Sequence, residues 1–257
     1  PTREPAHAAG TCRNLPRVFA PLTSLVRPVL QTYDDLPRYR RGPSLGRAPL
    51  CRTGFAKAPK KGYVPTLHAY PAAVVPRPHD WPENAAITGN WRLDEQPPWQ
   101  IPDDLQSFID AGDKPIYIGF GSMAFGSARN EAIIREALAL WGGRAVLARG
   151  WGGLTGAAVP SNAFLLDKAP HDKLFPLMRA VVHHGGAGTV LAGLTAGKPS
   201  FVIPQFFDQP YWGERVYALG CGPEPVRLRN LDADKLARGL EQLATDGNFA
   251  EKAARLG

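Results

Sequence analysis

The feature that most constrains this chain is a regular alternation of short apolar runs and longer helical segments from residue 105 onward. Buried strands of a parallel sheet are short and rich in Val, Ile and Leu, and each is followed by a crossover helix. Five runs fit this description, at residues 115–120, 145–148, 162–166, 180–183 and 200–203. The alternation therefore predicts an α/β fold, a doubly wound parallel sheet that occupies residues 105–257.

The segments between these runs carry helical spacing. Residues 129–141 place apolar side chains three and four positions apart, which predicts one buried stripe. Further helices are predicted around Leu174, Leu191 and Val216. A closing helix is expected after Asp232, a suitable N-cap residue. Its apolar side would consist of Leu236, Leu240 and Leu243.

The first part of the chain has a different character. Residues 1–62 hold 12 Lys and Arg against 3 Asp and Glu, together with nine prolines, and show little apolar periodicity. Such a segment is predicted to be irregular, because it has too few apolar residues to form a core. Its charge suits an arm that binds nucleic acid or an anionic membrane surface. A solvated tail is the favoured interpretation, since neither aromatic interleaving nor a basic helix organises the charge, and we expect no nucleic-acid partner.

Residues 63–104 join this segment to the predicted sheet. Apolar residues gather in LHAYPAAVVPRP, and a proline-containing run at 91–104 reads as an interdomain linker. No stretch of 18 apolar residues is present, which argues against a membrane-spanning protein. Cys12, Cys51 and Cys221 lie far apart without paired spacing, which excludes a disulfide scaffold and favours the reducing cytoplasm. Because residue 1 is Pro and no secretory signal follows, we expect a fragment or a processed start.

The strongest candidate site is the glycine-rich turn after the run at 180–183. Here VVHHGGAGT leads directly into a predicted helix that Gly197 and Pro199 would stop. Glycines allow the backbone to approach a phosphate, and the helix dipole favours negative charge by about 0.3 to 2 kcal/mol. The side chains of His184 and Thr189 can add hydrogen bonds. The alternative is a tight turn without a ligand, because a glycine pattern alone is a weak signal.

Two further loops would open on the same edge of the sheet. Gly119, Gly121 and Ser122 lie at the close of the first predicted strand, and Asp208 with Gln209 follows the fifth. A carboxylate beside an amide suits the adjacent hydroxyls of a sugar, although Asp208 can also be read as a helix N-cap. Neither a Walker lysine pattern nor GxGxxG after the first strand nor HExxH is found, so we predict no metal and no bound cofactor.

Taken together, these motifs resemble the UDP-dependent glycosyltransferases of the GT-B type, closest to the bacterial and fungal sterol glucosyltransferases and antibiotic glycosyltransferases. The resemblance covers residues 64–257 and rests on HAYPAAVVPRPHDWP, TGNW, PIYIGFGSM, APHDKLF, HHGGAGT and PQFFDQPYWGERV in that order. It implies a Rossmann-like donor domain preceded by a partial N-terminal acceptor domain. It also implies a UDP-sugar donor, metal-independent inverting transfer of a hexose, and a small lipophilic hydroxyl acceptor such as a sterol or polyketide, with membrane contact as an option.

The resemblance also assigns roles to individual residues. The donor diphosphate would contact His184, Gly186, Gly188, Thr189 and Ser122, and the hexose would contact Asp208 and Gln209. The nucleoside would lie near Ala169, His171 and Trp151, the last of which can equally be a loop tip between glycines.

The catalytic base is not assigned, because the family supplies it as a His near the start of a complete N-terminal domain. Residues 1–62 do not match that domain, so either this half is missing or the segment is foreign to the family. The chain alone is therefore expected to bind the donor and transfer weakly. The alternatives are a non-catalytic UDP-sugar-binding module that needs a separate N-terminal domain, a UDP-sugar epimerase, and a nucleic-acid-binding protein. The oligomeric state stays open.

Overall fold

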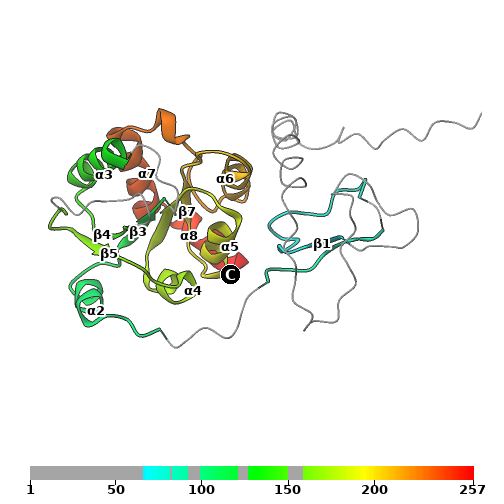
Figure 1. The fold of residues 1–257 in the computed structure, drawn as a ribbon, viewed down its shortest axis with the longest axis horizontal. Coiled ribbons are helices and arrows are strands. Elements are labelled where there is room, and N and C mark those ends of the chain that lie inside the picture. Colours follow the sequence, from blue (N-terminus) through cyan, green and yellow to red (C-terminus); the bar gives the residue numbers. More distant parts are fainter. Residues whose placement is uncertain (1–65, 82, 92–98, 121–126, 150–158) are drawn as a thin grey trace, which may run out of the picture. The chain divides into compact units, whose positions relative to one another are not determined.

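The computed structural model describes residues 66–81, 83–91, 99–120, 127–149 and 159–257 (Figure 1). These residues belong to two compact units, and the predicted irregular segment 1–62 lies outside the described part. Residues 77–89 belong to the first unit, whereas 70–76 and everything from residue 90 belong to the second. The second unit therefore includes a short piece of chain, 70–76, that precedes its main body in the sequence.

A five-stranded parallel sheet forms the centre of the second unit. Its strands are β3 (Ile116–Gly119), β4 (Ala145–Ala148), β5 (Ala163–Leu166), β6 (Ala180–His183) and β7 (Ser200–Val202). The order β5-β4-β3-β6-β7 reverses direction between β3 and β6, as in a doubly wound Rossmann-like sheet. In the register of the sheet, Ile116 of β3 lies opposite Ala145 of β4 on one side and Ala180 of β6 on the other. The predicted α/β fold class and all five predicted strands are confirmed.

One face of the sheet is covered by α3 (Ser127–Trp141) and α7 (Ala233–Thr245), which Figure 1 shows on the same side. The predicted stripe of α3 is buried at Ile133, Ile134, Ala137 and Leu138. These residues pack on Ile116, Ile118, Leu147 and Val182 of the strands. The predicted apolar side of α7 is buried in the same core, so both helices form because the sheet completes their apolar faces.

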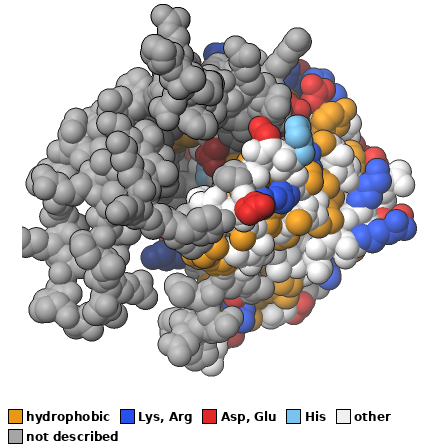
Figure 2. All heavy atoms as spheres, turned by 90° about the vertical axis from the view of Figure 1, so that its right-hand side faces the viewer, with side chains coloured by type: hydrophobic (Ala, Val, Ile, Leu, Met, Phe, Trp, Pro, Cys, Tyr) orange, Lys and Arg blue, Asp and Glu red, His pale blue; other side chains and the backbone are white. Residues whose placement is uncertain are grey.

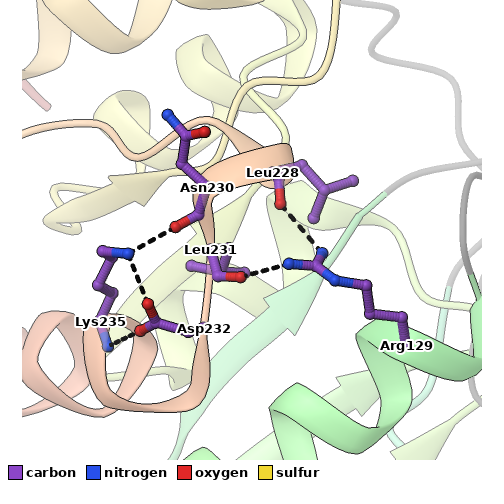
Figure 3. A network of polar contacts seen from close by, with 6 residues as sticks. All are labelled: Arg129, Leu228, Asn230, Leu231, Asp232 and Lys235. Atoms are coloured by element: carbon purple, nitrogen blue, oxygen red, sulfur yellow. Dashed lines mark hydrogen bonds and ion pairs between the residues drawn. The ribbon is translucent and has the colours of Figure 1, made fainter.

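A polar network fastens α3 to the start of α7 (Figure 3). The Arg129 guanidinium donates to the carbonyls of Leu228 (3.3 Å) and Leu231 (2.7 Å). Leu228 belongs to the 3-10 helix η3 (Leu228–Asn230). Asp232 caps α7 as predicted, since its Oδ1 accepts the amide N–H of Lys235 at 2.8 Å. The network ties the two helices of this face together at one end.

The opposite face carries the remaining helices of the second unit. They are α2 (Asp103–Asp110), α4 (His171–Leu174) with the 3-10 helix η2 (Phe175–Leu177), α5 (Ala187–Thr195), α6 (Gln209–Ala218) and α8 (Gly247–Leu256). Two buried clusters form here, one below β3 and β4 around Phe175 and one beside β7 around Trp212. Gly197 has a φ of +65° and ends α5, in agreement with the predicted stop.

Two helices were not expected from the pattern. Helix α2 begins inside the proline-containing run taken as a linker, and it buries only Leu105 and Ile109. The Arg144 guanidinium, which lies just before β4, donates to the carbonyls of Phe108 and Ile109 near the end of this helix. Helix α8 follows α7 after Asp246 and buries Ala253. Contacts from distant parts of the chain therefore hold elements whose own sequence signal is weak.

The first unit contains two short parallel strands, β1 (Thr66–His68) and β2 (Ala85–Ile87), in register from Thr66 opposite Ala85. His68 stacks on Trp81 with ring centroids 3.9 Å apart. The Arg77 guanidinium donates to the Ala85 carbonyl and lies over the Trp81 ring. In the part of this unit that the structure describes, the His68–Trp81 stack and the Arg77 guanidinium lie beside the two strands.

The described surface carries scattered apolar residues. Figure 2 shows, on the face that it draws, hydrophobic side chains lying between acidic and basic ones. The large apolar side chains that are exposed come from separate elements: Leu67, Trp91, Leu140, Phe207 and Tyr217. Among the described residues, none of the helices combines the length and the hydropathy that crossing a bilayer requires.

Candidate functional site

The reversal of strand order between β3 and β6 marks where a ligand binds in this architecture. Ligands of doubly wound sheets lie beyond the carboxyl ends of the strands, at the point where neighbouring strands lead to opposite faces. Gly119 ends β3 and pairs with His183, which ends β6. The loops that follow these two strands and β7 therefore form the candidate site.

The turn after β6 delivers the chain to the start of α5 through two glycines. Gly185 has a φ of +89°, and a Cβ there would lie 2.7 Å from Val202 Cγ1. Gly186 is the N-cap of α5, and a Cβ there would lie 2.7 Å from His184 Nε2. Gly185 needs a left-handed backbone, which favours glycine, and a Cβ on Gly186 would displace the His184 imidazole that lies directly against the chain.

The start of α5 presents backbone donors. The amides of Thr189 and Val190 both donate to the Gly186 carbonyl at 3.0 Å. The amides of Ala187 and Gly188 make no hydrogen bond to any other residue that the structure describes. A Cβ on Gly188 would meet no atom of the described residues within 4 Å, so none of their side chains covers this position. Unengaged amides and the helix dipole together attract an anion.

His184 lies beside these amides and is half-buried. Its Nδ1 is buried and has no hydrogen-bond partner among the described residues. Burial lowers the pKa of His184, and the nearby Asp208 carboxylate opposes that shift. The imidazole is therefore neutral at pH 7 and serves as a hydrogen-bonding group rather than as a fixed charge.

The loop after β7 is braced by Gln209. Its Oε1 accepts the amide N–H of Gln205 at 2.8 Å and that of Phe206 at 3.2 Å, and the residue is 6% exposed. Gln205 donates in turn to the Phe120 carbonyl, just beyond β3, at 3.5 Å. The amide oxygen that was assigned to sugar hydroxyls is therefore already engaged with the backbone in this structure.

Asp208 is exposed and occupies the N-cap position of α6, as the alternative interpretation expected. Its side chain does not cap the helix, however. Instead, Oδ2 accepts the indole N–H of Trp212 at 2.8 Å. The carboxylate is thus directed by an indole one helical turn further on, and it lies close enough to His184 to influence the pKa of that residue.

His171 approaches the same region from the loop after β5. It begins α4, stacks on Phe175 with centroids 4.4 Å apart and meets Tyr117 edge-on at 5.9 Å. Burial lowers the pKa of His171, and His184 lowers it further, so the two imidazoles lie within electrostatic range. Ala169, just before α4, is half-buried against the same cluster.

The structure thus brings most of the predicted site residues to one edge of the sheet. His184 with Gly186, Gly188 and Thr189 forms the turn into α5. Asp208 raises the pKa of His184 against the effect of burial, and His184 in turn lowers the pKa of His171. Ser122 and Trp151 lie outside the described residues. The described part of the chain holds no cluster of His, Cys, Asp or Glu that suits a metal ion.

Three side chains at this edge were not singled out from the sequence. His183 is fully buried, and its Nδ1 accepts the Gly185 amide N–H at 3.0 Å. Gln205 links two of the loops, and Trp212 holds Asp208. The spacing of Asp208 and Trp212, four apart on a predicted helix, is a signal that could have found the last pair.

Comparison with known proteins shows what the chain is similar to. Residues 152–257 match the C-terminal domain of the erythromycin biosynthesis protein CIII-like family. The chain is 42% identical over 185 residues to a sterol 3-beta-glucosyltransferase of Arabidopsis thaliana, an alignment that covers 71% of this chain and 29% of the plant protein. It is 34% identical over 222 residues to the O-mycaminosyltylonolide 6-deoxyallosyltransferase of Streptomyces fradiae, which covers 86% of this chain and 50% of that protein.

A solved structure supports the fold. The kitacinnamycin glycotransferase superposes with a TM-score of 0.56 at 24% identity, over 75% of this chain and 49% of that chain. The chain spans half the length or less of each of these three proteins. In its sequence the chain is therefore similar to glycosyltransferases that act on sterols and on antibiotic precursors, and its fold is similar to that of a solved glycosyltransferase.

Proposed function

We propose that this chain binds a UDP-hexose, in particular UDP-glucose, and serves the transfer of the hexose to a lipophilic hydroxyl acceptor such as a sterol or polyketide. The observation that carries the proposal is the start of α5. The amides of Ala187 and Gly188 there have no partner among the described residues, the His184 imidazole lies against the preceding Gly186, and Asp208 acts on the pKa of His184. Glucose as the hexose and a sterol as the acceptor are supported by the similarity to the plant sterol 3-beta-glucosyltransferase.

The donor diphosphate would lie at the N-terminus of α5. Its negative charge would be met by the two amides and by the positive end of the helix dipole, while neutral His184 would donate one hydrogen bond. Thr189, half-buried in the first turn, would add its hydroxyl. These groups would stabilise the charge that develops on the departing UDP, which is the part that a metal ion takes in other transferases.

Transfer would proceed as one inverting displacement. The acceptor oxygen would form a bond to the anomeric carbon as the bond to the β-phosphate oxygen breaks, and UDP would leave with that electron pair. The acceptor hydroxyl proton must pass to a general base. None of the described residues is assigned this role. Asp208 would hold hexose hydroxyls through the carboxylate oxygen that Trp212 does not engage.

A second candidate is a UDP-sugar-binding module that acts only with a separate N-terminal domain. The alignments favour it, because the chain covers 29% of the plant relative and 50% of the bacterial one. Both candidates use the same donor site, and they differ in whether this chain transfers sugar by itself.

Calorimetric titration and a transfer assay test both candidates. We expect the chain to bind UDP and UDP-glucose, and to transfer little or no glucose to a sterol unless an N-terminal domain from a relative is added. Rapid transfer by the chain alone would contradict the binding-module candidate and would place a general base within these residues. An absence of heat with either nucleotide would contradict the proposed function.

A further inference from the structure

The Asp208 carboxylate is held in an unusual way for an N-cap residue. An N-cap Asp ordinarily accepts the amides of the second or third helical residue. In α6 the second residue is Pro210, which has no amide hydrogen, and Asp208 makes no side-chain cap. Its Oδ2 accepts the Trp212 indole N–H at 2.8 Å instead. The carboxylate is therefore turned along the helix toward Trp212, while its residue as a whole stays exposed.

Trp212 is itself firmly placed. It is 7% exposed and belongs to the buried cluster beside β7. The Tyr70 ring meets it edge-on at a centroid distance of 6.2 Å, and Tyr211 meets it at 5.6 Å. A tryptophan has only two side-chain torsions, so contacts on several sides leave its N–H with a single direction.

The segment 70–76 completes this support. Val74 and Val75 are buried against α5 and α6, in the same cluster as Trp212. The Arg215 guanidinium, also on α6, donates to the Val74 carbonyl from Nε at 3.0 Å and from Nη2 at 2.7 Å. Two hydrogen bonds from one planar group fix the segment against the helix. The segment therefore keeps the Tyr70 ring in contact with Trp212, whose indole N–H donates to Asp208.

We propose that Trp212 is a positioning residue for donor recognition: its indole N–H fixes the Asp208 carboxylate toward the hexose hydroxyls, and Tyr70 fixes the indole. The inference rests on the proposed function, in which Asp208 contacts the hexose. A hydroxyl-binding carboxylate discriminates well only if its oxygens are held in place before the sugar arrives. The indole removes the freedom of one oxygen and leaves the other to accept from the ligand.

The test separates affinity for the sugar from affinity for the nucleotide. Dissociation constants for UDP-glucose and UDP are measured on the full chain by calorimetry, and their ratio reports the hexose contribution. Trp212→Phe keeps most of the ring and removes the N–H. We expect the ratio to rise by about fivefold to tenfold, because a charge-assisted hydrogen bond is lost, while UDP affinity stays within about twofold. Thermal unfolding of each variant establishes that it is folded.

The matched control is Trp99→Phe, the same substitution at a half-buried tryptophan that packs with α2 on the other cluster of this face. It should leave both constants unchanged. Tyr70→Leu keeps both partners of the hydrogen bond and loosens only the indole, so it should raise the ratio by about twofold to threefold. An unchanged ratio in both Trp212→Phe and Tyr70→Leu would overturn the proposal.

A double-mutant cycle distinguishes failure of this proposal from failure of the proposed function. Asp208→Ala should raise the ratio, and adding Trp212→Phe to it should have no further effect, because the indole acts only through the carboxylate. Independent, additive effects would show that Trp212 acts through the core and would overturn the positioning role. If Asp208→Ala itself leaves the ratio unchanged, Asp208 does not contact the hexose, and both the positioning role and that part of the proposed function are wrong.

Discussion

His183 and His184 are neighbours in the sequence with different surroundings. The His183 side chain is fully buried and accepts the Gly185 amide through Nδ1, which leaves the proton on Nε2. That buried Nε2 has no hydrogen-bond partner among the described residues. His184 lies half-buried against Gly186 at the start of α5. His183 therefore shapes the turn, whereas the His184 imidazole lies against the start of α5.

This burial makes the stability of the fold depend on pH. Desolvation lowers the pKa of His183 from 6.5 to about 3, so the folded protein keeps the side chain neutral where the unfolded chain binds a proton. The contribution is fully present above pH 6.5 and is lost progressively as the pH falls toward 3. The free energy of unfolding should fall by up to about 1.4 kcal/mol per pH unit in this window.

Urea unfolding of the wild type and of His183→Asn, at intervals from pH 7 to pH 4, checks this prediction. Asn can still accept the Gly185 amide but does not titrate in this range. Its stability curve should therefore be flatter than that of the wild type, with His171 and His184 contributing equally to both. If the free energy of unfolding depends on pH in the same way in both proteins, His183 is not the buried titrating group.

At the scale of elements, α7 packs unusually close to the sheet. A Cβ on Gly239 would lie 2.4 Å from Cε1 of Phe201, a β7 residue that is 1% exposed. The backbone of the helix therefore rests directly on an aromatic ring. This close approach lets the leucines of α7 reach the core that α3 also fills.

Gly239→Ala tests this packing. Alanine normally favours a helix over glycine by about 1 kcal/mol, but here the clash should dominate and lower the free energy of unfolding by about 1 to 3 kcal/mol. The control is Gly247→Ala in the first turn of α8, where a Cβ would meet no atom within 4 Å. That variant should be unchanged or more stable by up to about 1 kcal/mol. Equal effects in denaturant unfolding would argue against close packing of α7.

At the scale of the whole molecule, the sequence predicted the fold class well because each strand carries its own signal. The short runs of Val, Ile and Leu mark β3 to β7, and their alternation with helices is enough to predict a parallel sheet. Helix α2 was missed because it buries only Leu105 and Ile109, and because the arginine that fastens it is Arg144, far along the chain. Local patterns do not report such distant contacts.

For the candidate site, the sequence predicted where the loops lie but not how their side chains are used. Glycine turns at strand ends and the Asp208-Gln209 pair are local features, so the sequence located them and the strand order brings them together. How the side chains are used was not predictable in this way. That Gln209 would brace Gln205 and Phe206, and that Trp212 would hold Asp208, depends on rotamers fixed by the surrounding packing.

The central claim is that the diphosphate of a nucleotide sugar binds at the start of α5 with the help of His184, and calorimetric titration of UDP tests it most directly. His184→Ala should weaken UDP binding by about tenfold or more, because one hydrogen bond to a charged group is lost. Its thermal unfolding should change little, since Nδ1 has no partner among the described residues. His79→Ala, an exposed histidine of the first unit, is the control and should bind UDP like the wild type. UDP affinity of His184→Ala within about twofold of the wild type would contradict the claim.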